Sequence, residues 1–395
     1  MSFNIALSGI NAINTELNTI SHNIANAGTF GFKSSRANFA SMYAGTQPTG
    51  TQVSSQTQSI EIGGGVLTTG RGMDASIQGR GFFVTRDTSG AEVYTRVGIF
   101  DTDNQGYVVD SFGRRVQGYA AVPGTTTLGA LGDLQVATGQ IPAQASSTLS
   151  YVGNLSADWS IPTVAPFDPT DPQSFNGSLV SVVYDSLGVQ HSVTQYFVKT
   201  GDNQVTVHYS FDGATHATTT VLDFDTSGQL VAPAGAVPLA LGTPTGAAPL
   251  DINVSYTGTT MTAGEATTST NSADGYASGT FLGVQLSADG SVLAQYSNGI
   301  KQSIGTIAIA TFPAENQLVQ ISDTAWTTSA ESGAALYSTP GSGMAGQLTP
   351  GALEQSNVDM TSQLVNLMSA QRNYQANTKV ISTENEMMRA LMQAV

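Results

Sequence analysis

Residues 3–24 read FNIALSGINAINTELNTISHNI, and an apolar residue recurs in this stretch at alternating spacings of three and four. Such a heptad pattern places the apolar side chains along one face of a helix. It predicts an amphipathic helix of about 24 residues, whose apolar stripe must be covered by another element. The stripe consists of Phe3, Ala6, Ile10, Ile13, Leu17, Ile20 and Ile24.

The other end of the chain carries a longer pattern of the same kind. A helix from about Ser356 to Val395 would be about 60 Å long at 1.5 Å per residue. We expect the two terminal helices to pair within the chain and to leave about 15 residues of the longer helix for contacts with other chains. The heptad positions, apolar except at three polar residues, are Met360, Leu364, Leu367, Gln371, Tyr374, Thr378, Ile381, Asn385, Met388, Met392 and Val395.

The middle of the chain is predicted to be all β from about residue 60 to residue 340. Clusters of Gly, Pro, Asn and Asp recur there, and the apolar runs between them are short and rich in β-branched residues. The predicted fold class is therefore mainly β with α-helical termini.

Charge divides this β region. Residues 71–115 hold six of the nine arginines, whereas residues 146–285 hold eleven acids and one cation, Lys199, for a net charge of 1 − 11 = −10. We interpret residues 146–285 as an inserted acidic β domain. The other predicted parts are a helical domain of residues 1–30 and 356–395, a connecting segment of residues 31–70 and 341–355, and a β domain of residues 71–145 and 286–340.

Composition excludes several classes of protein. The chain has 13 Lys and Arg against 28 Asp and Glu, a net charge of −15, which disfavours binding to nucleic acid. It has no cysteine, so it can form neither a disulfide nor a thiolate metal site. No apolar run approaches the ~18 residues of a membrane span, so we expect no membrane insertion. The N-terminus lacks the features of a cleaved signal peptide.

The motifs of common active sites are missing from the sequence. Residues 101–106, DTDNQG, begin like a calcium loop, but position 12 is Phe112 where a glutamate is required, so a hairpin turn is favoured. His191, His208 and His216 are not spaced as metal ligands. No Gly-x-Ser-x-Gly elbow or phosphate-binding loop occurs. We therefore predict no catalytic residue, no cofactor and no metal site, and expect the protein not to be an enzyme.

Motifs at both ends carry a resemblance to a known family. The N-terminal heptads are followed by Gly31-Phe32-Lys33, and a second set of motifs lies near the C-terminus. A chain with both sets resembles the bacterial flagellar axial proteins, the rod and hook group. Residues 73–83, MDASIQGRGFF, look like the shared β domain of that group. The motif positions are Asn23, Asn26, Gly31, Phe32, Lys33, Asn357, Asp359, Gln371, Tyr374, Gln375 and Asn377.

The resemblance implies a structural subunit of a helical homopolymer. Within the group, the inserted domain favours the hook type over the shorter rod proteins. The implied assembly is a curved, extracellular tube that acts as a universal joint between rod and filament. The implied partners are other copies of the chain, the distal rod protein, the hook cap protein, the hook-filament junction protein and the type III export apparatus.

The resemblance also implies that the terminal helices line the inner core of the tube and that the insertion lies outermost. The expected subunit contacts are Phe3, Ile10, Ile13, Leu17, Ile20, Ile24, Leu364, Leu367, Tyr374, Ile381, Met388, Met392 and Val395. Two alternatives stay open: a straight distal rod protein of the same group, and a secreted β-rich protein that binds carbohydrate.

Overall fold

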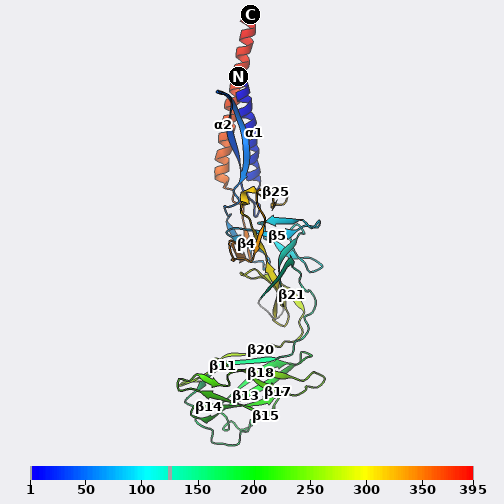
Figure 1. The fold of residues 1–395 in the computed structure, drawn as a ribbon, viewed down its shortest axis with the longest axis vertical. Helices are drawn as coiled ribbons and strands as arrows, with labels where there is room; N and C mark the ends of the chain where they lie inside the picture. Colours follow the sequence, from blue (N-terminus) through cyan, green and yellow to red (C-terminus); the bar gives the residue numbers. More distant parts are fainter. Residues whose placement is uncertain (1, 123–126, 395) are drawn as a thin grey trace. The chain divides into compact units, whose positions relative to one another are not determined.

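The computed structural model describes residues 2–122 and 127–394. The chain is mainly β with a helix at each end, as the sequence predicted (Figure 1). It forms two compact units. Unit 1 consists of Met1–Thr138, Gly283–Gln295 and Lys301–Val395, and unit 2 consists of Gly139–Leu282 and Tyr296–Ile300.

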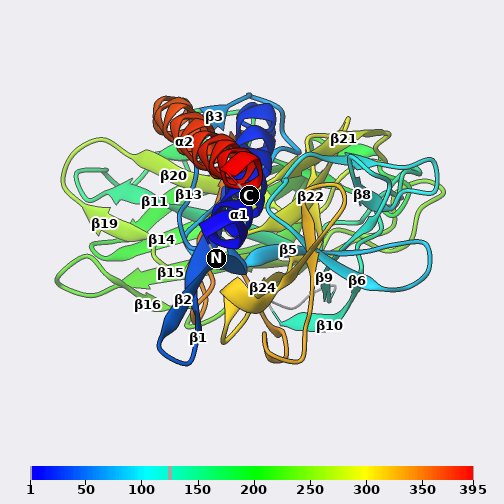
Figure 2. The ribbon, with the colours of Figure 1, turned by 90° about the horizontal axis from the view of Figure 1, so that it is seen from above.

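Two α-helices, α1 (Ser2–Ala25) and α2 (Met360–Ala394), lie side by side in unit 1 (Figures 1 and 2). They run antiparallel. Near one end, a Cβ added to Gly9 would lie 3.2 Å from the side-chain amide of Asn377. Near the other end, Asn23 Nδ2 donates to Gln363 Oε1 at 3.2 Å.

Helix α2 begins at Met360 because Asp359 caps it. Asp359 Oδ1 accepts from the backbone N–H of Thr361 at 2.9 Å, and the Ser362 hydroxyl donates to Oδ2 at 2.6 Å. The bond from the Ser362 hydroxyl, followed by the backbone bonds, lowers the pKa of Asp359. The helix therefore starts later than the predicted position at Ser356.

A long hairpin of β1 (Ser35–Ala44) and β2 (Gln47–Gln58) runs along α1 (Figure 1). The Thr51 backbone N–H donates to Ser8 Oγ of α1 at 3.2 Å. Strands were predicted only from about residue 60, so this hairpin, which lies in the predicted connecting segment, was not predicted. Its burial pattern does not alternate cleanly, because the hairpin packs on a helix rather than forming one face of a core.

The β part of unit 1 centres on one large sheet, in which the order of the main path is β21-β22-β23-β9-β5-β6-β26-β25. The core beneath it is aromatic: the Phe82 ring lies 5.4 Å from Trp326, and Tyr94 lies 4.8 Å from Phe312. The residues 103–106 form the predicted hairpin turn, in which Gly106 N–H donates to Asp103 O at 3.0 Å. The strands of this sheet are β5 (Phe82–Arg86), β6 (Glu92–Thr95), β7 (Phe100–Thr102), β8 (Val108–Asp110), β9 (Arg115–Ala121), β10 (Leu128–Asp133), β21 (Phe281–Leu286), β22 (Ser291–Tyr296), β23 (Lys301–Ile307), β24 (Ile309–Thr311), β25 (Val319–Ile321), β26 (Ala325–Thr327) and β27 (Leu336–Ser338).

Two short ladders connect this sheet region to the helices. Strand β4 (Ala75–Gln78) pairs with β28 (Gln347–Pro350), and β3 (Val66–Thr68) pairs with β29 (Ala352–Glu354). A short 3₁₀ helix, Glu315–Gln317, precedes β25. The ladders join the two parts of the chain that lead out of α1 and into α2.

Unit 2 is built from two five-stranded sheets that share one core. In β14 the residues alternate between buried and half-buried, which is the pattern of a sheet with one face on a core. The sequence placed the insertion at residues 146–285, whereas the compact unit begins at Gly139. The strands are β11 (Thr148–Ser156), β17 (Val237–Ala240), β18 (Asp251–Ser255), β19 (Thr260–Thr262) and β20 (Thr267–Ala273) in one sheet, and β12 (Gly177–Tyr184), β13 (Gln190–Gly201), β14 (Gln204–Phe211), β15 (Ala214–Phe224) and β16 (Leu230–Ala232) in the other.

His191 gives unit 2 a predictable dependence on pH. Its Nδ1 lies 2.6 Å from Asp212 Oδ2, and its Nε2 lies 3.4 Å from Asp185 Oδ2. Burial disfavours the charged imidazole, but the two carboxylates outweigh burial and raise the pKa of His191 above its ordinary value of 6.5. The stabilisation that the folded chain gains from charged His191 is therefore complete below pH 6.5. It is lost as the pH rises through the pKa of His191 in the folded state.

We expect a His191→Gln variant to be less stable than the parent chain at pH 5.5, with a difference that shrinks toward pH 8.5. Thermal unfolding of both chains across this range measures it. Burial lowers the pKa of His208, which gives the opposite pH dependence, so the comparison uses the difference between the two chains. A difference that stayed constant over the range would contradict the prediction.

Candidate subunit interface

An apolar seam joins α1 to α2. Ile13, Ile20 and Ala370 are buried at its centre. Leu17, Ile24, Leu367 and Tyr374 are half-buried around them. At about 0.8 kcal/mol per buried CH₂, this contact stabilises the pairing of the two long helices.

The rotation of α2 differs from the heptad prediction at alternate positions. Gln363, Ala370 and Asn377 face α1, together with the predicted residues Leu367 and Tyr374. The predicted positions Leu364, Gln371 and Thr378 are exposed instead. The reason is the Asn23 to Gln363 hydrogen bond and the small size of Gly9 and Ala370, which let the backbones approach on this side.

The N-terminal turns of α1 are only partly covered in the single chain. Phe3 is 47% exposed and Leu7 is 42% exposed, although Ala6 between them is buried. Ile10 is half-buried. Phe3 was expected in the stripe and lies at its exposed end.

The C-terminal turns of α2 extend past α1. Gly9 lies opposite Asn377, and Asn23 lies opposite Gln363. Because the helices are antiparallel, the residue numbers of opposite positions have a constant sum, which is 386 for both pairs. Ser2, the first residue of α1, therefore lies opposite position 386 − 2 = 384. We call residues 385–394 the tail.

The tail continues the face of α2 that packs on α1. The observed seam positions 363, 367, 370, 374, 377 and 381 lead at the same spacing to Met388 and Leu391. Met388 is 62% exposed, Leu391 is 66% exposed and Met392 is 77% exposed. Ile381, the last predicted residue before the tail, is half-buried. The predicted contact Val395 lies outside the described residues.

A second apolar row runs along the first half of α2. Met360, Leu364 and Met368 follow one another at intervals of four residues, with Val365 beside them, and all are 41–51% exposed. Contiguous exposed apolar patches mark surfaces that contact other molecules. Leu364 therefore belongs to an outward face of α2 rather than to the pair with α1.

The motif asparagines fix the ends of the two helices within the chain. Asn23 Nδ2 donates to Ser35 O at 2.8 Å, and Asn23 Oδ1 accepts from the Ser35 backbone N–H at 2.9 Å. Asn357 Oδ1 accepts from Ser34 N–H at 2.7 Å, and its Nδ2 donates to Ser59 O at 2.9 Å. These bonds tie the start of the hairpin to both helices.

A buried cluster of charges lies beside this junction. Lys33 Nζ lies 2.6 Å from Glu354 Oε1, and Arg96 Nη1 lies 3.2 Å from Glu354 Oε2. All three side chains are almost fully buried. Burial, opposed by the attraction of Glu354, lowers the pKa of Lys33. Glu354 also accepts from Gly64 N–H at 3.0 Å, so its carboxylate holds three separate segments together.

Gly31 allows the chain to turn into this cluster. Its φ is +68°, and a Cβ would lie 3.0 Å from the Arg96 backbone carbon. Its N–H donates to Glu354 O at 2.8 Å. Phe32 next to it is buried, and its ring lies 5.4 Å from His22.

The remaining motif residues have local or outward roles. Asn26 Nδ2 donates to His22 O at 2.9 Å at the end of α1, and Asp359 caps α2. Gln371 and Gln375 are exposed on α2, which leaves them available for contacts with other chains. No role was predicted from the sequence for Glu354, Arg96 or Ala370. The small size of Ala370 at heptad spacing from Leu367 and Tyr374 was the one available signal.

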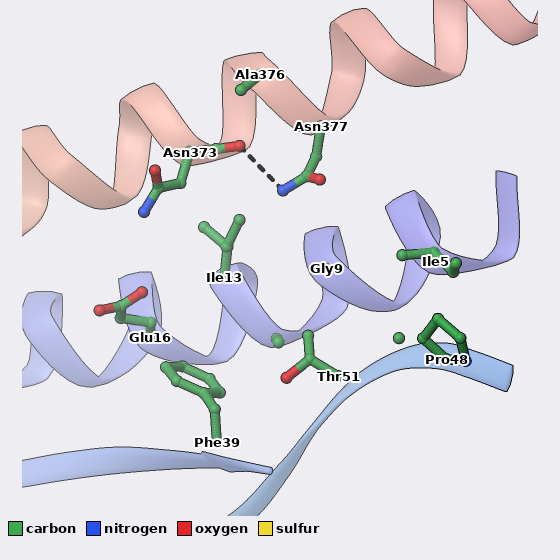
Figure 3. Close-up of a pocket in the computed structure, with 12 residues that line it drawn as sticks. Ile5, Gly9, Ile13, Glu16, Phe39, Pro48, Thr51, Asn373, Ala376 and Asn377 are labelled. Carbon is green, nitrogen blue, oxygen red and sulfur yellow. Dashed lines mark hydrogen bonds between the residues drawn. The ribbon is translucent and has the colours of Figure 1, made fainter. Parts of the chain in front are cut away.

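A groove of about 520 Å³ lies between α1, α2 and the hairpin (Figure 3). Ile5 and Phe39 line it and are 37% and 43% exposed. Asn373, Ala376 and Asn377 contribute the wall from α2, and Asn377 Nδ2 donates back to Asn373 O at 3.1 Å. Glu16 is the one charged residue among the lining residues. We call this hollow the groove.

Two kinds of feature are absent from residues 2–122 and 127–394. No group of three or more His, Asp or Glu side chains in these ranges is placed to hold a metal ion. No helix in them is long and apolar enough to cross a membrane.

Four protein families match consecutive parts of the chain. "Flagella basal body rod protein" matches residues 3–33, and "Flagellar hook protein FlgE/F/G D1 domain" matches residues 76–148. "Flagellar basal body protein FlaE D2 domain" matches residues 154–276, and "Flagellar basal body rod FlgEFG protein C-terminal" matches residues 349–394.

Curated relatives match over nearly the whole length. The chain is 38% identical to the flagellar hook protein FlgE of Escherichia coli strain K12, over 99% of both chains. It is 38% identical to that of Salmonella typhimurium over 99% of both chains, and 32% identical to that of Treponema pallidum over 97% of this chain and 96% of the relative. The crystal structure of the Helicobacter pylori flagellar hook protein FlgE2 has a similar fold, with a TM-score of 0.53, 13% identity, and coverage of 73% of this chain and 100% of the other.

Proposed function

The chain belongs to the flagellar hook proteins and is a subunit of the bacterial flagellar hook, and we propose that its exposed helical faces are the contacts through which copies polymerise. The observation that carries the proposal is the tail, which presents Met388, Leu391 and Met392 to solvent in the single chain. An exposed apolar face of this kind marks a contact with another protein. Of the interface residues predicted from the sequence, Phe3, Leu364, Met388 and Met392 are exposed and are part of this proposal. Ile13 and Ile20 are buried between α1 and α2 of the same chain and support the contact only by holding the helix pair together.

We infer that the helical part forms the inner core of the tube and that the acidic insertion lies outermost. Apolar rows on long helices support the first half of this inference, because helices of neighbouring copies can cover them. The net charge of −10 over residues 146–285 supports the second half, because a strongly charged domain favours exposure to solvent. The rod alternative is not favoured, because the full-length relatives are named as hook proteins.

We further propose that the hook formed by this chain is curved and works as a universal joint between rod and filament. Bending requires outer contacts that change partners at little free-energy cost. Unit 2 has few ion pairs and many Ser and Thr residues on its strands, for example Ser178 and Thr206. Such a surface offers many polar contacts of similar strength.

The relatives' names and the family support further expectations about partners and location. We propose that the chain is exported by the flagellar type III apparatus without a cleaved signal peptide and assembles outside the cell beneath the hook cap protein. Its neighbours at the two ends of the hook would be the distal rod protein and the hook-filament junction protein. The curated relatives are structural proteins by name, and we expect a structural rather than an enzymatic role.

Deleting the outer domain tests whether the helices are sufficient for polymerisation and whether unit 2 is needed for the curved form. Residues 147 and 274 are close together, since Ser147 N–H donates to Asp274 Oδ1 at 2.8 Å, so a deletion of residues 148–273 joins two adjacent points. We expect this variant to polymerise into tubes through its helices but without the curved form of the parent. Electron microscopy of the two polymers measures the difference. Complete loss of assembly would mean that the stabilising contacts lie in unit 2.

A further inference from the structure

The tail and the groove are two apolar surfaces of unit 1 that are exposed together. We propose that the tail of one copy docks in the groove of a second copy of this chain. This inference rests on the proposed function, since it names the contact through which hook subunits would join.

The tail cannot fill the groove of its own chain. Helix α2 is continuous from Met360 to Ala394, and its groove wall lies at Asn373–Asn377. The tail therefore points along the helix axis away from that wall. Its middle lies about 14 residues farther on, a distance of ~20 Å at 1.5 Å per residue. Only another copy, displaced by a similar distance along its helices, can bring a groove to the tail.

The groove and the tail agree in length. The groove extends along α1 from Ile5 to Glu16, which is about 17 Å of helix. The tail of ten residues is ~15 Å long at the same rise. One face of a helical segment of this length can therefore lie along the groove.

The two surfaces also agree in chemistry. Ile5 and Phe39 are partly exposed in the groove and offer apolar contact. The tail brings flexible Met side chains, which adapt to irregular apolar surfaces. Its Glu386 and Arg389 give it no net charge, so Glu16 in the groove does not repel the tail as a whole.

This contact joins different surfaces on the two copies. Each copy offers a tail and a groove, so every bound copy presents a new tail or groove to the next one. Such heterologous contacts generate open helical polymers rather than closed dimers. The tail-and-groove contact therefore has the symmetry that a hook requires.

Cysteine pairs test the proposal, because the parent chain has no cysteine. We would combine Ala376→Cys in the groove with Met388→Cys in the tail. These positions are 12 residues apart on one helix, ~18 Å, so a disulfide within a chain is impossible. The matched control combines Gln371→Cys, exposed on the other flank of α2, with Met388→Cys. Thr51→Cys with Met392→Cys provides a second pair across the groove from the hairpin side.

Each chain would be polymerised under reducing conditions, inspected by electron microscopy, oxidised and run on a denaturing gel. We expect a ladder of dimers, trimers and longer species from a groove and tail pair, at least fivefold stronger than from the control. Polymers that give no ladder with either groove pair, or an equal ladder with the control, would overturn the docking while leaving the hook function intact. Failure of the cysteine-free parent to polymerise would overturn the proposed function and the docking with it.

Discussion

Replacing Glu354 by alanine lowers the free energy of unfolding of unit 1 by about 3–5 kcal/mol, as expected when one partner of a buried ion pair is removed. The change leaves Lys33 and Arg96 buried without their common counter-charge. It also removes the acceptor of the Gly64 backbone N–H. Urea unfolding of the full chain, followed by circular dichroism, measures the loss.

A control variant shows how much stability is lost when a glutamate outside the buried cluster is removed. Glu331 is exposed, and we expect Glu331→Ala to change the free energy of unfolding by less than about 0.5 kcal/mol. A loss below about 1 kcal/mol for Glu354→Ala would show that the charge cluster is not a stabilising centre of the junction.

Replacing Ile13 by aspartate should abolish polymerisation while leaving the β sheets of both units folded. Ile13 is 8% exposed at the centre of the seam, so the change places a carboxylate against Ala370 and its neighbours without a hydrogen-bond partner. Loss of the buried side chain together with burial of the charge costs about 3–5 kcal/mol in helix pairing. The separated helices can then no longer present a tail and a groove in fixed positions.

Electron microscopy for polymers and circular dichroism for strand content measure the two outcomes. The control is Asn14→Asp, which introduces the same charge at the next residue, on the exposed side of α1. We expect Asn14→Asp to polymerise like the parent. Normal polymers from Ile13→Asp would mean that the helix pair is not required for assembly.

The heptad pattern predicted both terminal helices and most of the seam correctly. Ile13, Ile20 and Leu367 lie where the spacing placed them, because helical periodicity is a local property that can be read along one segment. The heptad spacing also predicts that α2 is longer than its partner. The family resemblance was carried by motifs at the two ends, and the full-length relatives confirm it.

The sequence could not predict the hairpin of residues 35–58 or the rotation of α2. The hairpin rests on α1 rather than on a regular core, so its side chains follow no clean alternation. The rotation of α2 depends on the bond between Asn23 and Gln363, which are 340 positions apart. A heptad pattern shows which positions are apolar but does not fix how far the helix is rotated about its axis against its partner.

What the sequence determined by itself was therefore the pair of amphipathic helices, the β-rich middle and the family. Only the tertiary structure decided that Lys33, Arg96 and Glu354 form one buried cluster, since Glu354 is 321 positions from Lys33 and 258 from Arg96. It also decided that α1 begins opposite position 384 of α2 and so leaves the tail exposed. Both results depend on the register between segments distant in the chain, which packing and long-range hydrogen bonds fix and local spacing does not.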